Sequence, residues 1–167
     1  DNLESWRTIS ANAAGSDVAT AKQWFPSDGA VSVDASSLYF VDGYLRISRS
    51  AGAVSHTTSV LLGGTATLSG SVYKAFTKTG DTAALAAENS TLIEVATATV
   101  IKAASTSTTE QIGIYVAGVI RSSAAGTLIP QFQYSAAPGG APSTLANSFY
   151  RLRKEGTSSA TSRGTWS

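Results

Sequence analysis

Cysteine and methionine are missing from the 167-residue sequence, and histidine occurs once. Without cysteine the chain can form neither a disulfide nor a thiolate metal site, and the cysteine count leaves the redox compartment open. One histidine and scattered acidic residues do not suit zinc. There is also no D-x-D-x-D-G-type loop to hold calcium. We therefore predict no metal site and no cofactor.

Charge is scarce as well. Charged residues make up 14% of the sequence, against about 25% in an average soluble domain. The net charge is +1, so no strong electrostatic field predicts nucleic-acid binding. Serine, threonine, alanine and glycine replace the charged residues, and this composition is common in fibrous and surface-displayed β proteins.

Long apolar runs are absent too. None approaches the roughly 18 residues of a membrane-spanning helix, and no basic segment followed by an apolar core marks a signal peptide. We expect no membrane insertion. A chain of this length suits one domain. We predict an N-terminal arm or linker at residues 1–25, a β-sandwich domain at 26–156 and a flexible C-terminal tail at 157–167, with Trp24 and Phe25 plugged into the domain.

The clearest pattern present is alternation in residues 111–134. Alternate side chains of a strand leave opposite faces, so five residues would share one face: Ile112, Ile114, Val116, Gly118 and Ile120. Small, turn-forming residues follow at 121–126, and the alternation resumes at 127–135. Two alternating runs joined by a short glycine-containing loop predict an antiparallel hairpin.

Further strands are predicted along the whole chain, and no segment favours a helix strongly. Their positions are residues 30–34, 37–49, 56–62, 66–78, 91–103 and 148–154. Residues 79–89, with Gly80-Asp81 and an alanine-rich patch, are predicted to form a loop or a single helical turn. The proline- and glycine-rich residues 136–142 are predicted to form a loop. About eight short strands favour an all-β fold, an antiparallel β-sandwich or jelly roll.

Some strands carry apolar residues on both faces. Tyr115, for example, lies opposite the face of Ile114 and Val116. A second apolar face indicates a second buried surface, which packing between subunits would supply. The candidate subunit interface consists of Phe40, Tyr44, Tyr115, Phe132 and Tyr134. The tyrosines lie in predicted strands, so we interpret most of them as core or interface residues and not as platforms for binding sugars.

No catalytic motif is recognisable. His56 has no G-x-S-x-G elbow in the sequence and no acid placed beside it, so we expect it to bond backbone groups or hydroxyls. Asp34 and Asp42 lie near aromatic residues, and a glycosidase needs two such acids, but turns or bulges explain both. The glycine pairs at 63–64 and 139–140 lack a phosphate-loop context. We predict that the chain is not an enzyme.

Three segments resemble a module found near the ends of tailed-bacteriophage virion proteins. They are SHTTSVLLGG (55–64), YVAGVIRSSAAGTLIPQFQYSAAPGGAP (115–142) and NSFYRLRKEG (147–156). With the upstream WFPSDGAV segment, the resemblance covers roughly residues 24–156, and it departs at Ser123-Ala124. It implies a β-rich tail-fibre or head-decoration module, often a homotrimer of jelly-roll, tumour-necrosis-factor-like subunits. It implies no catalytic residues.

Two functions follow as expectations. The first is a non-enzymatic structural protein on the virion surface that associates with itself and with capsid or tail proteins. Its N-terminal arm would then anchor a head-decoration protein. The alternative is a carbohydrate- or receptor-binding module of a tail fibre, with a host surface glycan or receptor as partner. A hydrolase is a third hypothesis, which would depend on His56 or on an acid pair.

Overall fold

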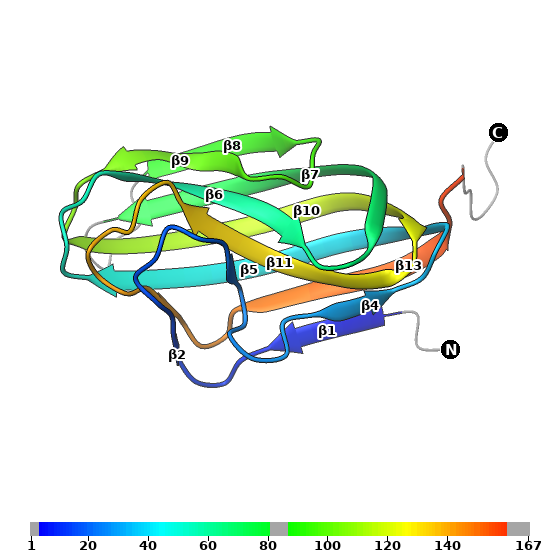
Figure 1. Cartoon of the computed structure of the whole chain (residues 1–167), viewed down its shortest axis with the longest axis horizontal. Coiled ribbons are helices and arrows are strands. Elements are labelled where there is room, and N and C mark those ends of the chain that lie inside the picture. Colours follow the sequence, from blue (N-terminus) through cyan, green and yellow to red (C-terminus); the bar gives the residue numbers. More distant parts are fainter. Residues whose placement is uncertain (1–3, 81–86, 160–167) are drawn as a thin grey trace.

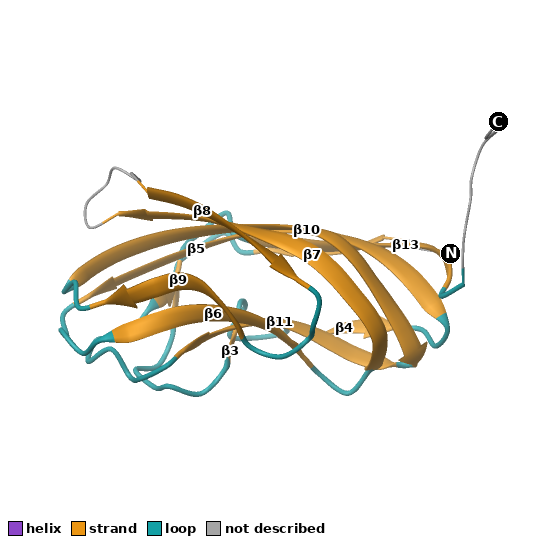
Figure 2. Cartoon of the chain, turned by 90° about the horizontal axis from the view of Figure 1, so that it is seen from above, coloured by secondary structure: helices purple, strands orange, loops and turns teal. Residues whose placement is uncertain are grey.

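The computed structural model describes residues 4–80 and 87–159, and over these residues the protein is all-β. Two antiparallel sheets pack face to face as a sandwich (Figures 1 and 2). This confirms the predicted fold class. No helix in the described part of the chain is long and apolar enough to cross a membrane.

The larger sheet forms one layer of the sandwich. In spatial order its main strands are β1 (Glu4–Thr8), β13 (Phe149–Thr157), β5 (Ser37–Ser50), β10 (Thr109–Ala124), β7 (Thr67–Gly80) and β8 (Ala87–Ile93). Two short strands extend it, β2 (Ala13–Ala14) and β12 (Ser143–Thr144). β12 pairs with both β2 and β5.

The smaller sheet forms the second layer. Its strands are, in spatial order, β3 (Lys22–Gln23), β11 (Gly126–Tyr134), β6 (His56–Gly63) and β9 (Thr99–Ser105). The short strand β4 (Val31–Val33) also pairs with β11. Figure 2 shows this layer below the layer that contains β5, β10 and β13.

The predicted hairpin at residues 111–134 is wrong. β10 pairs with β5 and β7, whereas β11 pairs with β3, β4 and β6 in the other sheet. The chain therefore crosses between the two layers at Ala125. Alternation identified both strands correctly, but it reports which residues face the core and not which strand pairs with which.

The prediction of one strand at residues 91–103 is wrong as well, because the structure has two strands there. β8 ends at Ile93 in the larger sheet, and β9 begins at Thr99 in the smaller one. The backbone carbonyl of Ala96 in this crossover accepts a hydrogen bond from the Leu62 amide at 2.9 Å. Threonine and valine have strand propensity in either place, so composition did not reveal the crossover.

The other predicted strands and loops agree better with the structure. The strands predicted at 30–34, 37–49, 56–62, 66–78 and 148–154 correspond to β4, β5, β6, β7 and β13. The predicted loop at 136–142 has no strand. The predicted loop at 79–89 is replaced by strand at both ends, and its residues 81–86 lie outside the described residues.

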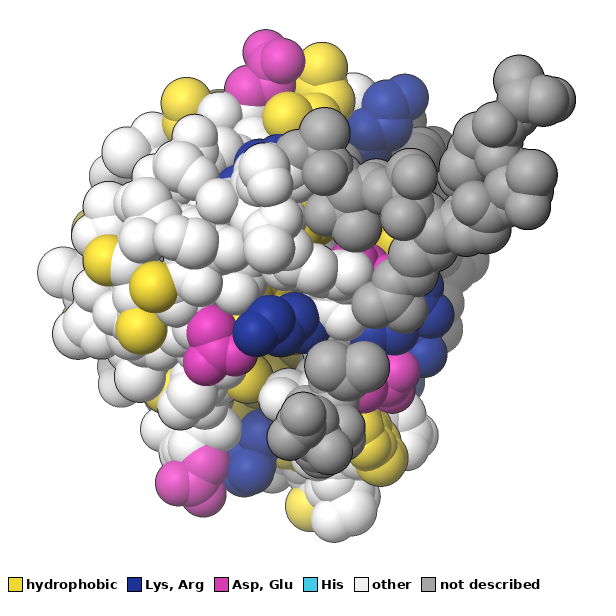
Figure 3. All heavy atoms as spheres, turned by 90° about the vertical axis from the view of Figure 1, so that its right-hand side faces the viewer, with side chains coloured by type: hydrophobic (Ala, Val, Ile, Leu, Met, Phe, Trp, Pro, Cys, Tyr) yellow, Lys and Arg dark blue, Asp and Glu magenta, His cyan; other side chains and the backbone are white. Residues whose placement is uncertain are grey.

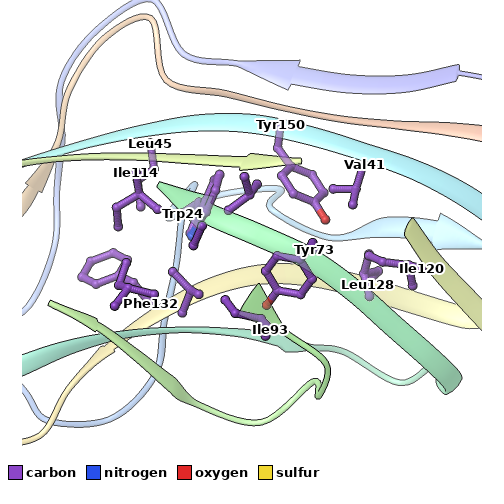
Figure 4. Close-up of a cluster of buried hydrophobic side chains, with 14 of the residues drawn as sticks. Trp24, Val41, Leu45, Tyr73, Ile93, Ile114, Ile120, Leu128, Phe132 and Tyr150 are labelled. Carbon is purple, nitrogen blue, oxygen red and sulfur yellow. The ribbon is translucent and has the colours of Figure 1, made fainter. Parts of the chain in front are cut away.

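The core lies between the two sheets, and Trp24 is at its centre (Figure 4). Trp24 and Phe25 are 2% and 1% exposed, which confirms that they plug into the domain. The Trp24 and Tyr150 rings meet edge to face at 5.5 Å between centroids. At Gly43 a Cβ would lie 3.0 Å from Cζ3 of Trp24 and 2.8 Å from Cδ2 of Tyr150. Glycine at this place makes room for both rings.

The described part of the N-terminal segment is not a separate arm. β1 pairs along its length with β13 and forms an edge of the larger sheet, while β3 pairs with β11. At the other end of the chain β13 continues to Thr157, and the amide of Ser158 donates to the Ser36 carbonyl at 2.8 Å. The rest of the predicted tail, residues 160–167, lies outside the described residues.

Candidate functional site

The structure divides the candidate interface residues into two groups. Phe40 and Tyr115 are 43% and 40% exposed on the outer face of the larger sheet, and Tyr44 is half-buried beside them. Phe132 and Tyr134 are 2% and 1% exposed, so including these two in a subunit surface was wrong. They lie on β11 with their rings in the core, and their alternation with Gln131 and Gln133 reflects inward packing.

Cross-strand register brings the outer apolar residues together. Tyr115 is paired with Tyr44 on β5, and Val119 is paired with Phe40 on β5 and with Val72 on β7. Paired residues in adjacent strands project from the same face. We call Phe40, Tyr44, Val72, Tyr115 and Val119 the face patch. Over its Phe40 and Tyr115 side lies a hollow of about 420 Å³.

A second group of exposed apolar residues lies around one side edge of the sandwich, with Leu92 on the outer face of the larger sheet and Val100 on the outer face of the smaller sheet. β8 and β9 are the last strands of the two sheets at this edge, next to each other along the top of Figure 1. Leu92 on β8, Val95 in the crossover and Val100 on β9 are all exposed. We call these three residues the edge patch. The sequence did not reveal it, because 91–103 was interpreted as one continuous strand.

Charged residues border the face patch on the β13 side. The Arg151 guanidinium holds Asp42 with two contacts, Nε to Oδ1 at 2.8 Å and Nη2 to Oδ2 at 3.2 Å. The hydrogen bond and charge of Asp42 raise the pKa of Arg151. The Arg153 guanidinium lies 5.6 Å from the centre of the Phe40 ring. At the end of the molecule seen in Figure 3, basic side chains likewise lie beside acidic ones on a mostly uncharged surface.

Next to this ion pair lies a further hollow of about 460 Å³. Its lining comes from three strands of the larger sheet, β1, β5 and β13, and consists of Glu4, Trp6, Thr8, Asp42, Phe149 and Arg151. Trp6 is 66% exposed. Sequence reasoning missed this site because it assigned Trp6 to an arm, and the segment around Trp6 shows no alternation that would predict a strand.

A buried ion cluster surrounds Glu110 at the end of the sandwich where β10 begins. Its carboxylate lies 2.6 Å from Arg49 Nε, 2.6 Å from Lys102 Nζ and 2.9 Å from His56 Nε2. Burial alone would raise the pKa of Glu110, but the Lys102 and Arg49 cations lower it to about 2. The cluster joins β5 and β10 of one sheet to β6 and β9 of the other.

No acidic partner for His56 was recognisable in the sequence, but in the structure Glu110 lies beside its ring. Its Nδ1 is 2.7 Å from the Val54 carbonyl and its Nε2 faces Glu110. The ring also packs edge to face on Tyr134, at 4.9 Å between centroids. With both nitrogens occupied, neither is directed at a serine hydroxyl as a Ser-His-Asp triad requires.

The two acids weighed as a glycosidase pair are each occupied by a different cation of β13. Asp34 Oδ2 lies 2.7 Å from Lys154 Nζ, and Asp42 is held by Arg151. The hydrogen bond from the Lys154 ammonium to Asp34 raises the pKa of Lys154. Within residues 4–80 and 87–159, no group of three or more histidine or acidic side chains could hold a metal ion.

The tyrosines weighed as sugar platforms are mostly internal. Four of the six are buried in the core: Tyr39, Tyr73, Tyr134 and Tyr150. Tyr44 and Tyr115 remain at the outer surface.

Comparisons with known proteins give no family for this chain. No family model matches it, and no curated protein matches it. Two solved structures of infectious bursal disease virus, of the Gx and Gt strains, are 13% and 12% identical with TM-scores of 0.17 and 0.14. They cover 93% and 92% of this chain, which spans 42% and 41% of theirs. Scores this low carry no argument about fold or function.

Proposed function

We propose that this chain is a non-enzymatic structural module of a tailed-bacteriophage virion, a head-decoration or tail-fibre module that assembles as a homotrimer. The observation that carries self-association is the pair of exposed apolar surfaces, the face patch and the edge patch. Large exposed apolar patches on soluble domains mark interaction sites. The phage assignment is supported by the resemblance over residues 24–156.

The strand order supports a tumour-necrosis-factor-like jelly roll. If β7 and β8 are set aside as a hairpin added at one edge, β1-β13-β5-β10 faces β4-β11-β6-β9. The chain changes sheet from β5 to β6, from β9 to β10 and from β10 to β11. Such repeated crossing between two four-stranded sheets is the connectivity of a jelly roll built from Greek keys.

Two different patches favour a ring over a two-fold dimer. A two-fold dimer uses one self-complementary patch on both subunits, whereas a head-to-tail contact joins unlike patches and closes when the rotation permits. In the proposed trimer the edge patch of each subunit packs on the face patch of the next. This packing also covers β8 and β9, the last strands of the two sheets at this edge, and covering an edge strand protects a sheet from unwanted pairing.

Sedimentation of matched variants tests this arrangement. Tyr115→Glu charges the face patch and Val100→Glu charges the edge patch. Thr20→Lys alters an exposed residue just before β3, at the edge of the smaller sheet opposite β9. We expect the parent chain and Thr20→Lys to sediment as trimers and each glutamate variant to sediment as a monomer. A mixture of the two glutamate variants should form heterodimers, because one intact face and one intact edge remain.

Two results would overturn the trimer. One is a parent chain that stays monomeric at micromolar concentration. The other is a two-fold dimer, recognised because one of the two patches proves dispensable. The virion assignment is tested separately with antibodies against the chain, which should label the surface of intact phage particles that encode it. Intact particles without label would contradict that assignment.

A glycan-binding module remains the second candidate function. The observation that favours it is the mixed hollow at Trp6, which lies at the β1 margin of the outer face, away from Val72 and the edge patch.

A further inference from the structure

The hollow beside Trp6 combines a flat exposed aromatic ring with a planar pair of hydrogen-bonding groups. We propose that it binds a neutral glycan, with one hexopyranose ring stacked on the Trp6 indole and its hydroxyls bonded by Asp42 and Arg151. This inference rests on the second candidate function, to which it assigns a ligand class and contact residues, and it does not depend on the trimer.

Trp6 has the exposure that stacking requires. It lies on the edge strand β1, is 66% exposed and pairs in register with Arg151 on β13. One face of a pyranose ring carries mainly C–H groups, so it is apolar and flat, while the hydroxyls project around its rim. An indole offers a large rigid apolar surface at low conformational cost, which suits such a ring.

The ion pair supplies the polar half of the site. Arg151 is paired in register with both Trp6 on one side and Asp42 on the other, so the three side chains form one row across the sheet. Arg151 uses Nε and Nη2 on Asp42, and its Nη1 lies 3.9 Å from Glu4, beyond hydrogen-bond length. A guanidinium has five N–H donors and a carboxylate about four acceptor sites, so both keep capacity for hydroxyls.

The size and charge of the hollow indicate which class of ligand it can bind. Its volume of about 460 Å³ lies within the usual range of small-molecule sites, about 300–1,000 Å³. Two carboxylates, Glu4 and Asp42, face one guanidinium, Arg151, along its wall. A sugar acid would meet a net negative wall, and this favours a neutral hexopyranose over a uronic or sialic acid.

Isothermal titration calorimetry and saturation-transfer NMR on the full chain test the proposal. The probes are hexasaccharides of glucose, mannose, galactose and N-acetylglucosamine, with sialyllactose as the acidic comparison. We expect at least one neutral probe to bind and sialyllactose to bind more weakly. Trp6→Ala and Asp42→Asn should each lower the affinity at least tenfold.

Two control variants make the outcome specific. Leu92→Ala removes an exposed apolar side chain at the opposite margin of the same face and should leave the affinity unchanged. Tyr115→Glu should disrupt the proposed trimer without abolishing glycan binding. Circular dichroism checks that every variant is folded.

The proposal is overturned if none of the neutral probes binds, if Trp6→Ala binds as tightly as the parent, or if sialyllactose binds most tightly. Failure here leaves the sedimentation test unaffected, so the two proposals fail separately.

Discussion

Glu110 shows how much a single buried residue determines at one end of this sandwich. Its carboxylate oxygens contact side-chain nitrogens of Arg49, Lys102 and His56, which lie on strands of both sheets. Arg49 also donates to the carbonyls of Ala51, Gly52 and Ser107. Each buried cation is therefore satisfied, and the loops that end β5 and β9 are tied to the same group.

The low pKa of Glu110 predicts a specific acid sensitivity. Its pKa falls from 4.5 to about 2 on folding, so the folded state binds the proton less tightly than the unfolded state. The stabilisation is therefore complete above pH 4.5 and is lost as the pH falls towards 2. We expect the melting temperature of the parent chain to drop through this window in a pH series.

Glu110→Gln is the variant that isolates this effect. It leaves Arg49 and Lys102 buried without their counter-charge, and breaking a buried pair in this way costs about 3–5 kcal/mol. At neutral pH the variant should unfold at lower denaturant, and its stability should change less between the same two pH values. An acid-induced drop as steep as that of the parent would contradict the assignment to Glu110.

At the scale of elements, Trp24 anchors the segment that follows β3 in the core, in addition to the strand pairing of β1 and β3. Trp24 follows β3, and its amide donates to the Pro130 carbonyl at 2.9 Å. Its own carbonyl accepts from the Thr144 hydroxyl at 3.0 Å. The ring then fills the core beside Tyr150, where Gly43 leaves space. This segment belongs to the core as much as the long strands do.

Trp24→Ala should therefore destabilise the whole fold. Truncating a buried tryptophan costs about 3–5 kcal/mol, because apolar burial is lost and a cavity remains. Trp6→Ala on the exposed edge strand is the matched control and should change stability by about 0.5 kcal/mol or less. Urea denaturation followed by circular dichroism measures both. Equal effects of the two substitutions would contradict the different positions of the two rings.

At the scale of the whole molecule, both sheets share one core. Residues from each layer, such as Ile114 on β10 and Phe132 on β11, belong to the same buried cluster (Figure 4). A domain with one core unfolds as one unit, because no part keeps its apolar surface buried once the sheets separate. The N-terminal segment should take part in that transition.

Two optical probes test this in one sample. In a Trp6→Phe, Trp166→Phe variant the remaining tryptophan, Trp24, reports on the N-terminal segment, and far-ultraviolet circular dichroism reports on the sheets. We expect the two urea transitions to coincide within error. A fluorescence transition at clearly lower urea would mean that residues 1–25 detach first, as an independent arm would.

The alternation of apolar residues by itself determined the fold class and most strand positions, and the aromatic pair Trp24-Phe25 indicated its own burial. These are local properties, because a strand shows its inner face through every second residue. The absence of cysteine likewise excluded disulfides and thiolate metal sites directly. None of these conclusions needed to know which strands are neighbours.

Only the tertiary structure decided which strands pair and which residues meet. Inward-facing side chains of β10 and β11 look alike whether the strands form a hairpin or face each other across the core, so alternation could not exclude the hairpin that proved wrong. The same holds for Glu110 and His56, which are 54 positions apart, and for Trp6 and Asp42. Contacts between distant residues depend on the pairing of whole strands, and local pattern does not encode that pairing.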